Sequence, residues 1–520
     1  MKSFFNKDWQ YSYQKKDAED LYEAFLNCRN IKNNHGFLNP DIANLSCPFE
    51  LFPKLPKAID RIKKAIKDQE KVLVFGDYDV DGITSSAIMH YAILKLGLKN
   101  TIYIPSRKDG FGLNMNFVDN IIKNKFDLVI TTDCGISNHK EVSKLNNHQI
   151  DTIITDHHEQ PNKPPPAHAI IHNTHLVGAG VAFLFAKALL DDTPDFLLEL
   201  AALGTIADLG ILQGDNRILA NAGLKSLKNP KNKGIKALME KSCINPSEIN
   251  AEKIAFFLAP KLNAPGRVCH PINALRLIMG HTEEAIYLDE INEQRKELTE
   301  KYIQEILKQI NTNDPCIIGI SKAQSGLIGL IAGNLNEKYN KPSIILTEEE
   351  EVFKASCRGP DDFHIALALE NFKDYMTTFG GHKKAGGFSL KKQYIDQFIQ
   401  GFKSYTLEKR GTNPPPPKLQ LDFKIKQKDL KIDQIEKIMQ LDPFGEGFSQ
   451  PVFSMTDFNI NGIRILKERH LLIEIGGINA ICFNAPHASE LEFKEIAFSP
   501  EISTWRNEKQ LKLKIVDIKY

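Results

Sequence analysis

The sequence predicts an α/β protein with a parallel-sheet domain, a long helix leading to a second, smaller α/β domain, and a C-terminal β-barrel. Three observations support this prediction. Apolar strand patterns alternate with helical patterns over residues 71–209, and this order builds parallel sheets with helices on both faces. A long helical pattern then leads into a second, shorter alternation. Beyond a run of prolines, short strand-like segments dominate, which is typical of a barrel.

The first alternation predicts four strands, and each reads as a short apolar run such as KVLVF or DTIIT. The strands are expected over residues 71–75, 101–104, 127–132 and 151–155. A helix is expected after the first strand, from about Thr84 to Leu96, and further helical patterns cover residues 182–190 and 196–203. Such an order places the carboxyl ends of all four strands at one edge of a sheet.

A long helical pattern covers about residues 283–310, with apolar residues mostly three or four positions apart. The pattern fits equally a helix that bridges two domains and a surface helix of one domain. A strand, a helix and a strand are then expected over 316–320, 327–339 and 343–346. Four prolines predict a stiff, extended linker. The barrel strands are expected over residues 452–458, 471–475, 480–483 and 511–518.

The length of 520 residues indicates several folded units rather than one core. The patterns predict six segments: an N-terminal extension over 1–45, a first α/β domain over 46–280, a connecting helix over 281–311, a second domain over 312–410, a proline-rich linker over 411–418 and a barrel over 419–520.

Composition limits the class of protein. Hydrophobic residues make up 42% and charged residues 25%, and the net charge is only +1, so a nucleic-acid partner would have to bind local basic patches. The eight cysteines are scattered without a C-x-x-C pair, which argues against a disulfide framework or a zinc site. The N-terminus lacks the apolar core of a signal peptide. We therefore expect a soluble, cytoplasmic protein without a membrane span.

Acidic clusters follow the predicted strands. The motif GDYDVDG, residues 76–82, comes directly after the first strand, and Asp133 closes the third. The motif Asp156-His157-His158 closes the fourth strand, and Asp208 lies on or just after a helix. Because the carboxyl ends of parallel strands share one edge, we expect the clusters after these strands to meet in one crevice. So many carboxylates would repel one another unless cations lay between them.

Oxygen ligands joined by one or two imidazoles suit Mn²⁺ or Mg²⁺. Two such ions about 3.5–4 Å apart can activate a water and stabilise the leaving oxygen of a phosphodiester. We expect Asp133 to bridge the two ions and to act in catalysis with His157, and His158 to contact the phosphate or assist the leaving group. The expected metal ligands are Asp77, Asp79, Asp81, Asp133, His157 and Asp208.

Each of these residues taken singly has an ordinary explanation. An aspartate at a strand end is usually a helix cap or a turn residue. A D-x-D-x-D-G run also occurs in Ca²⁺ loops, but Ile88 stands at the twelfth loop position where such loops carry glutamate. The combination at one sheet edge is what favours a metal centre.

At these positions the chain resembles the DHH phosphoesterase superfamily, and within it the RecJ-type single-stranded-DNA-specific exonucleases. GDYDVDG, TTDCG, TDHH and TIADL resemble the metal motifs, while IPSRKDGFGLN, APKLNAPGR, ASCRG and FGGHKKAGGF resemble the nuclease branch. The resemblance runs from about residue 45 to the C-terminus. It implies a DHH catalytic domain, a DHHA1-type substrate-binding domain and an OB-type domain that binds single strands.

The implied activity is metal-dependent release of mononucleotides from single-stranded DNA, 5′ to 3′, in recombination and repair. Single-stranded DNA is the implied partner, and the resemblance suggests a helicase and a single-strand-binding protein as further ones. One alternative is a phosphodiesterase of the same superfamily that acts on short oligonucleotides or cyclic dinucleotides. The extra C-terminal domain argues against this alternative. The other alternative is a non-catalytic DNA-binding relative. The presence of a suitable residue at every metal position argues against it.

The resemblance assigns six residues to the substrate: Arg107, Asn263, Arg267, Ser356, Arg358 and His382. Two arginines and a serine of this set match positions that hold a terminal 5′-phosphate, because guanidinium forks and hydroxyls bind phosphate oxygens. His382 lies in a glycine-rich turn that a nucleotide could approach closely, and a glycine hinge is the structural alternative. A surface ion pair for Arg107, a helix cap for Asn263 and domain packing for Arg267 are the structural alternatives.

Three positions depart from the family pattern: Gln324, Phe448 and Gly386 stand where a histidine, an asparagine and an alanine are usual. None of the three is a metal position. The glutamine at position 324 leaves undecided whether the second domain makes one of the family's substrate contacts. In the barrel, Trp505 is the candidate for base stacking, with a packing role as an equal alternative. The aromatic residues expected in its core are Phe453, Phe458 and Phe483.

Overall fold

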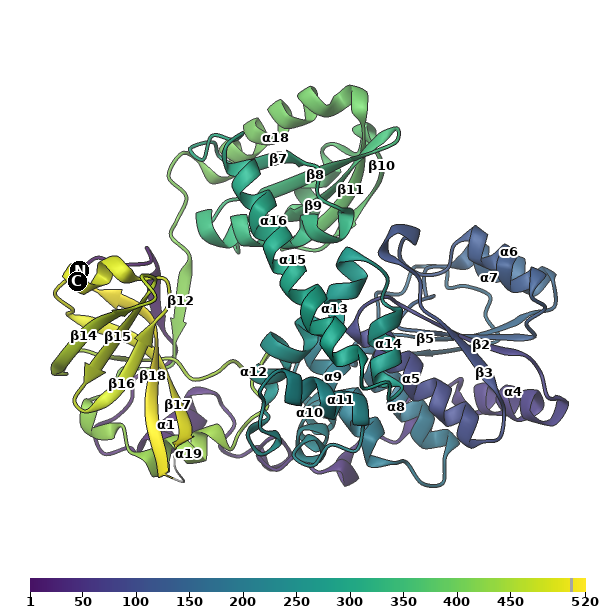
Figure 1. Cartoon of the computed structure of the whole chain (residues 1–520), viewed down its shortest axis with the longest axis horizontal. Helices are drawn as coiled ribbons and strands as arrows, with labels where there is room; N and C mark the ends of the chain where they lie inside the picture. The colour runs from purple at the N-terminus through teal and green to yellow at the C-terminus, as the bar shows by residue number, and fades with distance from the viewer. Residues whose placement is uncertain (506–507) are drawn as a thin grey trace. The chain divides into compact units, whose positions relative to one another are not determined.

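The computed structural model describes residues 1–505 and 508–520 and divides into two compact units (Figure 1). The larger unit comprises residues 40–409 and 445–448, and the smaller one comprises residues 1–39, 410–444 and 449–520. Among the described residues, none of the helices combines the length and the apolar character needed to cross a bilayer.

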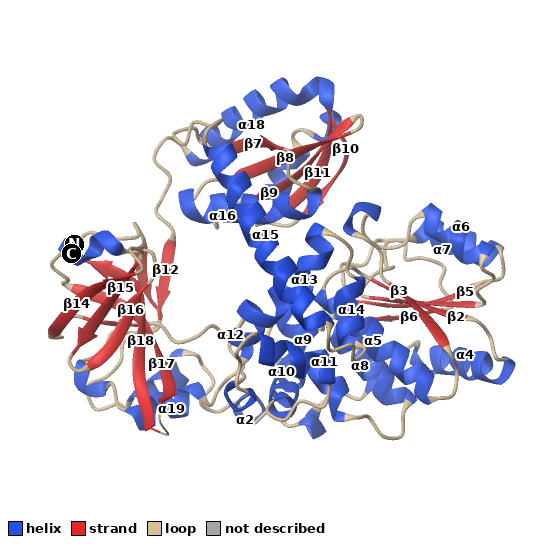
Figure 2. Ribbon diagram, viewed as in Figure 1, coloured by secondary structure: helices blue, strands red, loops and turns tan. Residues whose placement is uncertain are grey.

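The first sheet of the larger unit has five parallel strands in the order β3-β2-β4-β5-β6 (Figure 2). The strands are β2 (Val72–Gly76), β3 (Asn100–Tyr103), β4 (Leu128–Thr132), β5 (Asp151–Asp156) and β6 (Ala169–His172). Every residue of β2 and β4 is buried, which explains why these strands read as continuous apolar runs. The parallel α/β fold is confirmed. The sequence patterns did not predict the edge strand β6, because this strand has only four residues and follows a proline-rich loop.

Alternate residues of the central strands face two separate cores. Val72 and Val74 pack into one core with α4 (Leu55–Asp68), α5 (Val80–Lys95) and α8 (Gly178–Leu189). Leu73 and Phe75 point to the other side, because side chains alternate along a strand. Two further helices, α6 (Met115–Lys123) and α7 (His139–Asn147), complete that second core.

Helix α5 begins at Val80, four residues before the position that the sequence predicted. Its N-cap is Asp79, whose Oδ1 accepts a hydrogen bond from Gly82 N at 3.1 Å. The polar run DYDVDG read as a loop, but aspartate is a preferred N-cap because it satisfies the free N–H groups of the first turn. Asp81 therefore lies inside the first turn of α5.

Helices make up the rest of the first domain. These are α3 (Pro48–Leu51), α9 (Asp195–Ala207), α10 (Gly214–Leu227), α11 (Lys233–Lys241), α12 (Ala251–Lys253), a π-helical turn (Ile254–Leu258), α13 (Ala259–Val268), α14 (Ile272–Ile278) and α15 (Glu284–Leu307). Helix α15 contributes Leu288 to the core of the first domain and Ile306 to the core of the second. It therefore bridges the two, which decides between the alternatives that its sequence pattern left open.

The second domain has a five-stranded sheet in the order β10-β11-β9-β8-β7, in which only β7 and β8 are parallel. Its strands are β7 (Ile317–Ser321), β8 (Ser343–Glu349), β9 (Val352–Arg358), β10 (Met376–Gly381) and β11 (Ala385–Lys391). Its helices are α16 (Ser325–Tyr339), α17 (Ile365–Glu370) and α18 (Ile395–Arg410). The hairpin of β10 and β11 contains the glycine-rich turn predicted near His382.

The smaller unit contains a six-stranded sheet in the order β13-β17-β18-β16-β15-β14. The strands are β13 (Phe453–Met455), β14 (Ile460–Leu466), β15 (His470–Ile475), β16 (Ile478–Cys482), β17 (Glu495–Trp505) and β18 (Glu508–Lys519). Phe453 is buried as expected, but Phe483 is 43% exposed, contrary to prediction, because it lies beyond the end of β16. The side chain of Trp505 falls outside the described part of the structure.

The N-terminal segment folds with the C-terminal one. Strand β1 (Asp8–Tyr11) pairs in parallel with β12 (Lys418–Leu421). The fully buried carboxylate of Asp517 accepts hydrogen bonds from Trp9 Nε1 at 2.7 Å, from Phe5 N at 3.0 Å and from the Ser3 hydroxyl. The remaining helices of this unit are α1 (Leu21–Cys28), α2 (His35–Leu38) and α19 (Ile432–Met439).

Replacing Asp517 by asparagine should lower the free energy of unfolding of the smaller unit by roughly 1–3 kcal/mol, because an amide N–H₂ would face buried donors. The chain has two tryptophans, Trp9 and Trp505, and both belong to this unit. Urea unfolding followed by tryptophan fluorescence therefore measures it selectively. The control Asp8→Asn removes an exposed carboxylate of β1 and should change stability by less than about 0.5 kcal/mol. Equal effects of both variants would contradict the assignment.

Candidate metal centre and anion pocket

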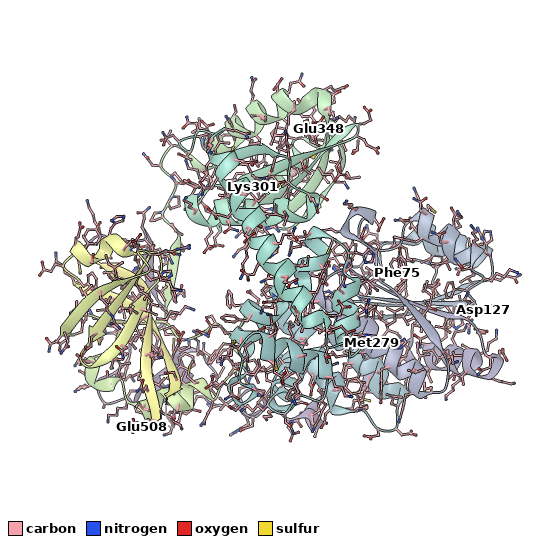
Figure 3. All side chains as sticks on the ribbon, in the orientation of Figure 1. Phe75, Asp127, Met279, Lys301, Glu348 and Glu508 are labelled. Atoms are coloured by element: carbon pink, nitrogen blue, oxygen red, sulfur yellow. The ribbon has the colours of Figure 1, made fainter. Side chains whose placement is uncertain are left out.

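The acidic residues gather at one edge of the first sheet. Asp77 follows β2, Asp133 follows β4 and Asp156 ends β5. In Figure 3, Phe75 near the end of β2 and Asp127 just before β4 mark opposite ends of this sheet. The cluster lies at the end marked by Phe75, the carboxyl edge. This is the convergence that the sequence predicted.

Three groups of side chains place potential ligand atoms within 4.8 Å of one another. They are Asp77, Asp79 and Asp133; Asp81, His157 and Asp208; and Asp133, His157 and His158. Asp133 and His157 each belong to two groups, so the potential sites adjoin. All six predicted ligands are therefore brought together, with His158 beside them. Which of them bind an ion remains a prediction.

Asp133 holds an unusual backbone conformation at the centre of the cluster. Its φ of +60° lies in the left-handed region, which aspartate tolerates better than most residues and which recurs at functional sites. Its N–H donates to Thr155 O at 2.9 Å, and this bond ties the turn after β4 to β5. The side chain consequently points at His157, whose Nε2 lies 3.1 Å from Asp133 Oδ1.

Two buried carboxylate oxygens, Asp77 Oδ1 and Asp133 Oδ1, accept no hydrogen bond. Burying an oxygen that carries charge without a partner is costly, and a cation would supply the missing partner. Carboxylate oxygens with a neutral imidazole suit Mn²⁺ or Mg²⁺. The residues present therefore fit a divalent cation centre.

Electrostatics indicate the same need for a cation. Burial, with neighbouring carboxylates adding to it, raises the pKa of Asp77, Asp81 and Asp133 well above the ordinary value. Burial and the charge of Asp79 raise the pKa of Asp208 to about 7. Burial and neighbouring charge thus favour the protonated forms of these groups in the absence of a metal, so cation binding competes with protons at this cluster.

Asp81 is fixed by the N-terminus of α8. Its Oδ2 accepts from Gly178 N and its Oδ1 from Ala179 N, both at 2.7 Å. A β-carbon at Gly178 would lie 2.7 Å from the Asp133 side chain, and one at Gly204 would lie 2.6 Å from Asp81 Oδ1. Since these approaches are closer than van der Waals contact, both positions require glycine for the carboxylates to lie where they do.

Asp156, which sequence reasoning did not include in the site, orients the two histidines. It is fully buried and accepts from the backbone N–H groups of Ile136, His157 and His158 at 2.9, 2.7 and 3.1 Å. Its Oδ1 also lies 2.8 Å from His158 Nδ1, so that Nδ1 carries the proton and Nε2 faces away from Asp156. The aspartate at the second position of the TDHH motif could have suggested such a partner for a neighbouring imidazole.

The two histidines have different protonation preferences. Burial, with the charge of His158 adding to it, lowers the pKa of His157 to about 4, so this ring is neutral and available as a metal ligand. Burial alone would lower the pKa of His158, but the hydrogen bond and charge of Asp156 raise it. His158 is therefore the better proton donor of the pair.

A basic pocket adjoins the second domain. The Arg107 guanidinium stacks on Tyr78 with its carbon 4.1 Å from the ring centre, and its Nη1 lies 3.4 Å from the Tyr78 hydroxyl. Arg107 and Ser356 both line a cavity of about 420 Å³. Arg358 Nη1 donates to Ser356 Oγ at 3.2 Å. The three predicted phosphate contacts thus lie together, and Tyr78 was missed as the support of Arg107.

Helix α13 carries the two other residues that were predicted from the LNAPGR motif. Asn263 Oδ1 accepts from Val80 N at 3.2 Å, and Arg267 Nη1 donates to Gly326 O at 3.4 Å in the first turn of α16. Burial, followed by the charges of Arg107 and Arg295, lowers the pKa of Arg267 to about 10. Mutually repelling guanidiniums here indicate a site for an anion. Arg295 was not predicted.

The remaining positions are peripheral. His382 is exposed in the turn between β10 and β11, where its N–H donates to Ala385 O at 2.7 Å. Gln324 is the exposed N-cap of α16. Phe448 is buried, with the Arg217 guanidinium 5.0 Å from its ring centre, which accords with a packing role.

Three family models match the chain: the DHH family N-terminal domain over residues 71–205, the DHHA1 domain over 313–408 and the RecJ OB domain over 421–517. With the sheet and its acidic edge, they define the class as a DHH-superfamily protein. The single-stranded-DNA-specific exonuclease RecJ of Bacillus subtilis is 32% identical over 92% of this chain, which spans 65% of that protein's length. The Salmonella typhimurium enzyme of the same name is 29% identical over 91% of both chains.

Solved structures agree with the sequence comparisons. The crystal structure of RecJ from Thermus thermophilus in complex with Mn²⁺ matches with a TM-score of 0.85 and 25% identity over 99% of this chain and 80% of that one. A structure of exonuclease RecJ bound to manganese matches with a TM-score of 0.60 and 29% identity over 68% of this chain. The chain belongs to the RecJ family of the DHH superfamily.

Replacing Asp133 by asparagine should stabilise the metal-free protein, because it removes one of several mutually repelling buried carboxylates. The same change should abolish the rise in melting temperature that Mn²⁺ causes in the unmodified chain. Differential scanning calorimetry with EDTA and then with Mn²⁺ measures both. The control Asp119→Asn breaks an exposed ion pair with Lys144 and should preserve the Mn²⁺ effect. A full Mn²⁺-induced shift in Asp133→Asn would exclude this aspartate as a ligand.

Proposed function

We propose that this chain is a metal-dependent exonuclease that hydrolyses single-stranded DNA from its 5′ end and releases mononucleotides. The observation that carries the proposal is the combination of a carboxylate and imidazole cluster with a guanidinium pocket in one folded unit. The first fits divalent cations and the second fits a terminal phosphate. The names of the relatives, which are exonucleases specific for single-stranded DNA, support the same substrate.

The acidic cluster is proposed to hold two divalent cations, Mn²⁺ or Mg²⁺, which supply Lewis acidity and lower the pKa of a water. Relatives of known structure contain these ions. The proposed ligands are the six predicted ones, with Asp133 shared between the two ions. His158, positioned by Asp156 Oδ1 at 2.8 Å, is proposed to donate a proton to the leaving 3′ oxygen or to contact the scissile phosphate.

The guanidinium pocket is proposed to set the length of each product. Arg107 and Arg358 would bind the terminal 5′-phosphate bidentately, with Ser356 as a third donor. A phosphate held at a fixed place relative to the metals positions the next phosphodiester for attack. One nucleotide is then released per cut. The 5′ polarity rests on the resemblance of these three residues to 5′-phosphate-binding positions.

The smaller unit is proposed to bind the strand beyond the cleavage site, as the match to the RecJ OB domain suggests. A helicase that opens duplex DNA and a single-strand-binding protein are proposed as partners, since both act on the same substrate. The proposed compartment is the cytoplasm.

A long single-stranded DNA labelled at either end and digested with Mn²⁺ tests the function directly. We expect label at the 5′ end to appear at once as a mononucleotide, label at the 3′ end to appear last, and EDTA to stop the reaction. The control Asp133→Ala should be inactive. Activity on dinucleotides or cyclic dinucleotides but not on the long strand would favour the short-substrate alternative, and residual activity of Asp133→Ala would indicate a contaminant.

The Arg358→Ala variant should lose most of the preference for a 5′-phosphate, because one charge-assisted contact is worth about 1.5–3 kcal/mol, or roughly ten- to a hundredfold in rate. Initial rates on 5′-phosphorylated and 5′-hydroxyl strands measure that preference. The control Arg276→Ala removes a half-exposed arginine paired with Glu284 and should keep it. An unchanged ratio of the two rates in Arg358→Ala would refute the anchoring role.

A further inference from the structure

The cavity beside the guanidinium pocket is larger than one phosphate requires. Its volume of about 420 Å³ lies in the range of sites that hold whole small molecules. Arg107 lines one part of it, and the second domain supplies the remaining walls. Within the described part of the chain, no carboxylate lines this cavity. The charged lining of this cavity is therefore basic, and it lies beside apolar residues that include Ile328 and Phe379.

The sheet of the second domain forms one wall. Ser356 on β9 is in register with Gly387 on β11, which is in register with Gly380 on β10. The two glycines leave bare backbone in this row, so the wall is recessed there. Alternate residues of β9, Ala355 and Cys357, point instead into the core.

A second row of side chains borders the recess. Lys354 is in register with Ser389, and Ser389 is in register with Thr378. All three line the cavity and share the face of Ser356, because side chains alternate along a strand. An ammonium group and two hydroxyls together are donors suited to phosphate oxygens. They form a polar edge that the terminal phosphate of the proposed function does not use.

The spacing of the basic residues suits an elongated anion. Lys354 precedes Arg358 by four residues on the extended strand β9, a separation of about 13 Å. A phosphate held by Arg358 and Ser356 therefore leaves Lys354 available to contact a further phosphate of the same anion. Lys354 Nζ now lies 2.7 Å from Glu349, but both side chains are more than a third exposed. Such pairs are weak in water, so the ammonium can exchange this partner for a phosphate.

We propose that Lys354, Ser389 and Thr378 form a second anion subsite, which accepts the outer phosphates of a strand that ends in a 5′-triphosphate. The proposal rests on the proposed function and extends it to a further class of chain end. The cleaved bond is unchanged: water adds to the phosphorus of the second nucleotide, the bond to the 3′ oxygen breaks, and that oxygen takes a proton. The first nucleotide therefore leaves as a nucleoside triphosphate.

The test compares one DNA sequence with a 5′-hydroxyl, a 5′-monophosphate or a 5′-triphosphate end, digested by the full-length protein with Mn²⁺. The unmodified chain should degrade the triphosphate strand at a rate within about threefold of the monophosphate strand. Chromatography of the first product should reveal a nucleoside triphosphate. The Lys354→Gln variant should lose about tenfold on the triphosphate strand and stay within twofold on the monophosphate strand.

A matched control is available in the same domain. Lys392 pairs with Glu348 at 2.7 Å and has the same exposed fraction as Lys354, 37%, but it does not line this cavity. Lys392→Gln should leave all three rates unchanged. A Lys354→Gln variant that slowed both phosphorylated strands equally, or neither, would overturn the second subsite. The second subsite would also be overturned if the effect of Lys354→Gln depended on the identity of the first base, because that result would indicate a nucleoside site.

Failure of the inference and failure of the proposed function give different results. If the unmodified chain leaves the monophosphate strand intact, the exonuclease proposal itself is wrong. If it degrades that strand but is more than tenfold slower on the triphosphate strand, only the second subsite is refuted.

Discussion

The mutual repulsion of buried carboxylates at one sheet edge is the constraint on which the rest of the structure depends. Asp77, Asp81 and Asp133 are each at most 3% exposed, and burial raises the pKa of each. A fold that only had to be stable would not collect such groups, because every one costs free energy without a counter-charge. The parallel order of β2, β4 and β5 nevertheless brings these loops together. Cation binding is what makes this arrangement favourable.

Small residues allow the helices to approach this edge. Gly178 and Gly204 bring α8 and α9 against Asp81 and Asp133, and a β-carbon at either position would collide with these carboxylates. On the other side, a β-carbon at Gly326 would lie 2.3 Å from the backbone oxygen of Arg267. The first turn of α16 can therefore lie against α13. Close backbone contact thus places the acidic cluster and the guanidinium pocket in one unit.

The opposite charges of these two regions have complementary consequences. Carboxylates gather at the proposed cation centre, and the guanidiniums of Arg107, Arg267 and Arg358 gather at the proposed anion pocket. The stacking of Arg107 on Tyr78 is a direct link, because Tyr78 lies between Asp77 and Asp79 in the GDYDVDG motif. A single loop therefore carries two of the proposed metal ligands, Asp77 and Asp79. It also carries Tyr78, which supports the proposed phosphate-binding residue Arg107. This loop therefore connects the acidic cluster directly to Arg107.

The sequence by itself determined the parallel sheet, the presence of a long helix near α15 and the identity of the acidic cluster, because periodicity and the sharing of one edge by parallel strands are local and topological properties. That α15 bridges two domains was decided only by its packing into both cores. The sequence did not reveal the role of Asp156, the support of Arg107 by Tyr78, or the presence of Arg295 beside Arg267. These depend on side chains that meet across segments far apart in the chain. The pairing of β1 with β12 was equally invisible, since four residues carry too little pattern to name a partner about 400 positions away. Only the tertiary structure decided these contacts, because each arises from packing between elements rather than from any element alone.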